Sequence, residues 1–114
     1  MKMNISINMK KVVFFLLVQF VVLGVSAQEV AVKEAEVAYT KEDYGKAIEL
    51  YEGLLNAHGE SAEIYYNLGN AYYKENKIAP AILNYERALL LEPGDGDIRF
   101  NLQLARQKSV DKIE

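Results

Sequence analysis

The sequence predicts an all-α fold: a helix-turn-helix solenoid with two full repeats, followed by the first helix of a third repeat or a capping helix. Comparison of the chain with itself at one fixed offset pairs Ala47 with Ala81 and Tyr51 with Tyr85. The same offset pairs Ile64, Asn67, Leu68 and Ala71 with Ile98, Asn101, Leu102 and Ala105. The paired apolar positions recur at helical spacing, and Gly, Pro or Asp marks the breaks between helices. A period of about 34 residues is typical of helical arrays, in which each repeat buries its apolar face against the next.

The segment 1–27 has the pattern of a secretory signal peptide. Lys2, Lys10 and Lys11 make its beginning basic, an apolar stretch covers 12–25, and small residues occupy 25–27. We predict cleavage before Gln28 and export, to the periplasm or the periplasmic face of the inner membrane. An uncleaved anchor is the alternative, although the apolar stretch is shorter than the roughly 20 residues that span a bilayer.

Charge and composition argue against several classes of partner. Removing the segment takes the formal net charge from −3 to −6, and an acidic chain lacks the clustered Lys and Arg that nucleic acid requires. Neither does it offer a basic patch for anionic lipids. Without cysteine there is no disulfide, no thiolate metal site and no lipid-anchor cysteine, so the domain at 28–114 must be held together by packing alone.

The first repeat, at about 28–61, is the looser copy, with helices predicted at 30–41 and 44–57. Ala35 and Ala47 take the positions where a small side chain is needed, and His58 and Gly59 close the second helix. Three tyrosines fill the space around the small residues: Tyr39, Tyr44 and Tyr51.

The second repeat, at about 62–95, has the clearest pattern. Ser61 is expected to cap its first helix. Gly69 and Ala81 are expected to be small because the two helices cross closely there, with Tyr72 and Tyr85 filling the space beside the crossing. The third unit, at 96–114, contains a helix predicted at 98–110 with an apolar stripe at helical spacing.

The second copy resembles the tetratricopeptide-repeat (TPR) family. The matching residues are Leu68, Gly69, Tyr72, Ala81, Tyr85, Ala88 and Pro93. The resemblance implies a non-catalytic module that binds a protein or peptide on the concave face lined by the first helices. Matched residue by residue, that face should include Glu63, Tyr66, Asn67, Asn70, Tyr73 and Lys74. For Tyr66 and Tyr73, simple packing on neighbouring helices is an equally open interpretation.

A narrower resemblance covers about 39–114. The segments 65–74, 97–106 and 110–114 resemble the TPR proteins of Bat (Bacteroides aerotolerance) operons. The resemblance implies an envelope scaffold linked to aerotolerance, with other Bat-operon proteins as partners. Such proteins usually continue into transmembrane helices, whereas this sequence ends at Glu114, which leaves membrane association open. TPR clamps for a C-terminal carboxylate use basic residues that are missing here; of the matching positions only Asn67 agrees.

No pattern of residues predicts catalysis, a cofactor or a metal. His58 is the only histidine, and it has no cysteine or second histidine nearby in sequence. The glycines at 94 and 96 lack the strand and the Lys-Ser/Thr of a phosphate loop. We therefore predict a protein-binding scaffold. Two alternatives stay open: a regulatory part of a larger membrane-anchored protein or enzyme system, and a self-assembling structural unit.

Overall fold

The computed structural model describes residues 8–11 and 27–113. The predicted signal segment lies outside the described residues except at 8–11 and 27. Residues 27–40 are helical, and four helices follow: α2 (Tyr44–His58), α3 (Ala62–Lys74), α4 (Ile78–Leu91) and α5 (Gly96–Ile113). The described part contains no strand and no helix long and apolar enough to cross a membrane. The predicted all-α helix-turn-helix fold is confirmed.

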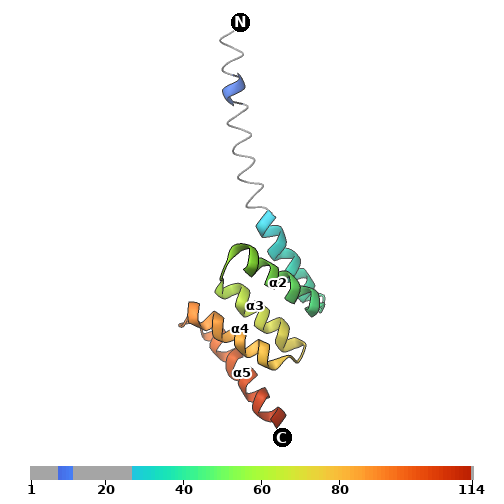
Figure 1. Cartoon of the computed structure of the whole chain (residues 1–114), viewed down its shortest axis with the longest axis vertical. Helices are drawn as coiled ribbons and strands as arrows, with labels where there is room; N and C mark the ends of the chain where they lie inside the picture. The colour runs from blue at the N-terminus through green and yellow to red at the C-terminus, as the bar shows by residue number, and fades with distance from the viewer. Residues whose placement is uncertain (1–7, 12–26, 114) are drawn as a thin grey trace. The chain divides into compact units, whose positions relative to one another are not determined.

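Residues 32–113 belong to one compact unit in which consecutive helices pack on each other. Helix α3 lies between α2 and α4, and α5 packs against α4 and, to a lesser extent, α3 (Figure 1). Turns of a few residues connect these helices, so each helix runs back along the one before it. This order places the first helices of successive repeats on one side of the array.

The turn inside each repeat has the same backbone geometry in both copies. Glu42 and Asn76, which occupy equivalent positions of the two repeats, have φ of 63° and 62°. In both turns the next residue donates its N–H to the carbonyl five positions back, at 2.9 Å. The repeat seen in the sequence is therefore repeated in the backbone.

Side chains at the helix starts explain where two of the helices begin. Ser61 accepts a hydrogen bond from the N–H of Ile64 at 3.3 Å, as predicted for a helix N-cap. Asp95 accepts from the N–H of Ile98 at 3.1 Å, and α5 begins at Gly96, shortly before the predicted start at 98. The earlier start follows because a carboxylate in the cap satisfies the free N–H groups of the first turn.

Burial in the core follows the same period as the sequence. Three pairs of equivalent residues share the same exposed fraction: Ala47 and Ala81 at 0%, Ala71 and Ala105 at 0%, and Tyr51 and Tyr85 at 2%. The alanines allow neighbouring helices to approach, and the tyrosine rings fill the remaining volume.

Gly69 lies where α3 and α4 approach, as predicted, and the neighbour that excludes a side chain there is Tyr85. A Cβ at Gly69 would lie 2.7 Å from two ring carbons of Tyr85. Tyr72 differs from its predicted role as a filler: it is half-buried, and its hydroxyl donates to the carboxylate of Glu52 on α2. Tyr72 therefore links the two repeats to each other.

Candidate functional site

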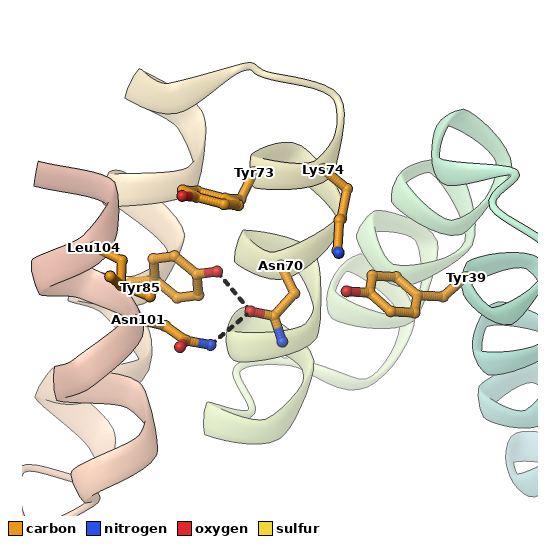
Figure 2. Close-up of a pocket in the computed structure, with 7 residues that line it drawn as sticks. All are labelled: Tyr39, Asn70, Tyr73, Lys74, Tyr85, Asn101 and Leu104. Carbon is orange, nitrogen blue, oxygen red and sulfur yellow. Dashed lines mark hydrogen bonds between the residues drawn. The ribbon is translucent and has the colours of Figure 1, made fainter. Parts of the chain in front are cut away.

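Two adjoining cavities, of about 230 and 400 Å³, share Tyr39 and Asn70 in their walls. We call the two together the groove. The smaller cavity is also lined by Tyr73, Lys74, Tyr85, Asn101 and Leu104 (Figure 2). The larger one is also lined by Glu36, Thr40, Tyr51, Glu63 and Asn67.

Helix α3 contributes lining residues to both cavities. Glu63, Asn67, Asn70 and Lys74 follow one another at intervals of four, three and four positions, so they lie on one face of the helix. Together with Tyr73 they place five of the six predicted site residues on the groove.

Tyr66, the sixth, lines neither cavity. Its ring packs against two clusters of buried core residues, one around Tyr85 and one around Tyr65. The centroid of the ring lies 6.0 Å from that of Tyr85. Its hydroxyl accepts a hydrogen bond from Asn101 Nδ2 at 2.9 Å. For Tyr66 the geometry therefore corresponds to the packing interpretation.

Tyr73 both packs against neighbouring helices and lines the groove. Its ring packs against the core cluster around Tyr85 and also lines the smaller cavity. The Nζ of Lys108, on α5, lies 4.7 Å from the centroid of the Tyr73 ring, which is within the range of a cation–π interaction.

Asn70 has the most defined geometry in the groove. Its Oδ1 accepts the hydroxyl of Tyr85 at 2.5 Å and Nδ2 of Asn101 at 3.1 Å (Figure 2). Among the described residues, Asn70 Nδ2 has no hydrogen-bond partner. The carbonyl side of this amide is thus held by the core, and its two N–H donors are left for a molecule in the groove.

Two tyrosine hydroxyls at the groove, those of Tyr51 and Tyr85, have raised pKa values. Burial raises the pKa of Tyr51 to about 12, and the carboxylates of Glu36 and Glu63 add to the shift. Burial also raises the pKa of Tyr85. Both hydroxyls therefore stay protonated to a higher pH than that of a tyrosine in water.

Several lining residues were missed from the sequence, although the repeat period contained the signal. Moving the predicted positions by one period gives the missed residues of the neighbouring repeats: Glu36 and Leu104 from Asn70, Tyr39 from Tyr73, and Asn101 from Asn67. The sequence pattern indicates only a filling role for Tyr51 and Tyr85. They reach the groove from the second helices, which a pattern based on first helices does not cover.

The groove is chemically suited to recognition. It combines aromatic faces, amide groups and separated charges. In the part of the chain that the structure describes, no three His, Cys, Asp or Glu side chains gather to hold a metal ion. His58, at the end of α2, is exposed and lines neither cavity.

Stacked helix pairs with a groove along their first helices define a helical-repeat interaction domain. Comparison with known proteins gives the particular repeat: residues 62–95 match the family model described as Tetratricopeptide repeat. Residues 62–95 are thus similar to a TPR, a repeat that is typically a non-catalytic module binding a protein or peptide, and the helix-turn-helix arrangement is consistent with a TPR solenoid.

The chain is also similar to a yeast protein, the "Peroxisomal targeting signal receptor" of Saccharomyces cerevisiae. The two are 33% identical over 67 residues, which is 59% of this chain and 11% of the receptor. The chain therefore matches only a small part of that protein's length.

Proposed function

We propose that this protein is a non-catalytic scaffold that holds an extended segment of another protein in the groove. The observation that carries the proposal is the fixed amide of Asn70, with Oδ1 engaged by Tyr85 and Asn101 and Nδ2 left to donate. An extended peptide offers backbone carbonyls at regular intervals, and a pre-oriented donor binds one without first losing rotamer freedom.

The other lining groups fit the same kind of ligand. Tyr39 and Tyr73 offer ring surface with little conformational entropy to lose, and Asn67 adds a second amide one helical turn before Asn70. The summed cavity volume lies in the range of binding clefts. The likeness to a receptor named for a targeting signal supports recognition of a protein segment, without bringing that signal to this chain.

The test uses a random nonapeptide library displayed against the full chain, with Asn70→Asp as the variant. The carboxylate keeps an acceptor for Tyr85 and Asn101 but removes both N–H donors. We expect the selected peptides to bind the wild-type chain and to lose at least tenfold in affinity to Asn70→Asp, while the urea midpoint stays close to that of wild type. Asn56→Asp, an exposed change on α2 away from the groove, is the matched control.

Two results would contradict the proposal. One is a library that yields no peptide above background. The other is a set of peptides whose affinities are the same for Asn70→Asp and Asn56→Asp.

We further propose that the scaffold works in the bacterial cell envelope, as part of an aerotolerance or envelope complex. The signal-like segment at 1–27 and the resemblance of 65–74, 97–106 and 110–114 to Bat-operon TPR proteins support this. Cell fractionation with an antibody to residues after Gln28 tests it. Recovery with the periplasm or the inner membrane is expected, and recovery in the cytosol would refute it. A membrane-bound product larger than 12.9 kDa would favour the alternative, a regulatory part of a larger anchored protein or enzyme system.

A further inference from the structure

Charge is separated along the groove. The charged residues that line the larger cavity, Glu36 and Glu63, are both acidic. The charged residue that lines the smaller cavity, Lys74, is basic. The shared wall between them is neutral, since it consists of Tyr39 and Asn70.

Neighbouring groups add to the difference in charge between the two cavities. Lys108 lies over the ring of Tyr73, which lines the same cavity as Lys74, so a second cation contacts a wall residue of that cavity. Among the described residues, Lys74 forms no ion pair. At the acidic end, the ion-pair partner of Glu36 among the described residues is the exposed Lys33, at 3.8 Å. Glu63 has no ion-pair partner among the residues described. An exposed pair of this kind neutralises little of a site's potential.

The two ends lie a fixed distance apart on one helix. Glu63 and Lys74 are eleven positions apart on α3, which is close to three helical turns, so both lie on the same face. At 1.5 Å per residue the separation along the axis is about 16 Å. An extended peptide advances about 3.3 Å per residue, so it covers this distance in about five residues.

From this geometry we infer that the groove selects an extended protein segment with a basic side chain and a carboxylate about five residues apart. The basic group lies between Glu36 and Glu63, and the carboxylate lies at Lys74, in the cavity whose wall residue Tyr73 contacts Lys108. The inference rests on the proposed function, because it names the class of segment that the same groove binds.

The dipole of α3 offers a competing reason for the two charges, since an acid near the first turn and a base in the last turn both stabilise a helix. That explanation does not involve Glu36, which lies outside α3, and it predicts no effect on ligand choice. Peptide selection therefore separates the two explanations, and unfolding measurements do not.

The experiment repeats the nonapeptide selection with the full chain as wild type, Lys74→Ala and Glu63→Gln. Against wild type we expect enrichment of peptides with Lys or Arg and a carboxylate about five positions apart. Lys74→Ala should lose the preference for the carboxylate but keep that for the base, and Glu63→Gln should do the reverse. For one selected peptide, each variant should lower the affinity about two- to fivefold, as for a partly exposed charge pair, and about 0.5 M salt should reduce the difference.

Lys46→Ala and Glu49→Gln on α2 are the matched controls. Both side chains are exposed and line neither cavity, so we expect the wild-type selection to persist. Displaying the library with free and with blocked C-termini separates the two sources of carboxylate. Dependence on a free terminus would identify the end of a chain, and equal enrichment would identify an Asp or Glu side chain.

The outcomes distinguish this inference from the proposed function. Peptides that bind and depend on Asn70 but carry no separated charges would overturn the inference and leave the groove as a peptide site. Loss of charge preference in the α2 controls as well would also overturn it. A library without binders would overturn both.

Discussion

A single methyl group at Gly69 is expected to destabilise the fold, although the same change normally strengthens a helix. Gly69 lies inside α3, where replacing Gly with Ala adds about 1 kcal/mol of helix stability. Its Cβ, however, would lie 2.7 Å from two carbons of the Tyr85 ring. Tyr85 is only 2% exposed, so its ring has little room to move away.

The size of the effect follows from these opposing terms. Overpacking a close contact costs about 1–3 kcal/mol, and a ring that does shift weakens the bond from its hydroxyl to Asn70, worth about 1 kcal/mol. After subtracting the helix gain, Gly69→Ala should lower the free energy of unfolding by about 1–3 kcal/mol. For a domain of this size, the melting temperature should fall by about 4–8 °C per kcal/mol.

Gly53 provides the matched control, because it lies inside α2 and no atom lies within 4 Å of the place that a Cβ would take there. Gly53→Ala should therefore raise the free energy of unfolding by about 0.5–1 kcal/mol. Both variants are compared with wild type by urea unfolding followed by far-ultraviolet circular dichroism, with the midpoint and slope determined separately.

A double-mutant cycle with Tyr85→Leu identifies the partner in the clash. Without the aromatic ring, Gly69→Ala should become neutral or stabilising. The reasoning would be refuted if Gly69→Ala stabilised the wild-type protein as Gly53→Ala does. It would equally be refuted if Gly69→Ala destabilised the Tyr85→Leu background by the same amount as wild type.

Three further predictions test the helix ends and the link between the repeats. Glu42 has φ of 63°, a strained value for a residue with a side chain. Glu42→Gly should therefore raise the free energy of unfolding, measured by urea titration, by up to about 1 kcal/mol. A loss of stability would contradict this. Ser61→Ala removes the cap of α3 and should lower the free energy of unfolding by about 1 kcal/mol. The control, Ser61→Asp, should stay close to wild type. Burial and the hydrogen bond to Glu52 raise the pKa of Tyr72 from 10.0 to about 12. Because the unfolded chain ionises near pH 10 and the folded chain does not, the stability from this group is fully present below about pH 10 and is lost as pH rises from there to about 12. Tyr72→Phe should flatten that decline in urea midpoints measured from about pH 9 to 12, and an unchanged slope would contradict the assignment.

The sequence allowed the fold to be predicted because the repeat shows the same structural requirement several times. Ala47 and Ala81 mark one close approach, and Ala71 and Ala105 mark another. A match at one position could be chance, whereas matches at one period across several helix faces require a common packing. The start of α5 at Gly96 precedes the predicted start at 98, because it depends on the single carboxylate of Asp95 rather than on periodicity.

The site was only partly predictable because its geometry depends on contacts between repeats. The pattern placed Asn70 on the groove, but the orientation of its amide depends on Tyr85 and Asn101, which come later in the chain by 15 and 31 positions. Tyr66 has the same pattern support as Asn70, yet the hydrogen bond from Asn101 and the packing against Tyr85 hold it away from both cavities. Periodicity identifies the face of a helix, but it does not say which side chains on that face are engaged by the next repeat.

The same contacts connect the core to the groove. Tyr85 fills the space that Gly69 leaves open, and its hydroxyl reaches Asn70 at the wall shared by the two cavities. A ring displaced from Gly69 therefore also releases one of the two bonds that orient the amide. Gly69→Ala should thus weaken peptide binding even where the protein remains folded, since a freely rotating amide must be ordered again on binding. The proposed peptide site needs this rigidity, and one glycine in the core provides the space for the ring that maintains it.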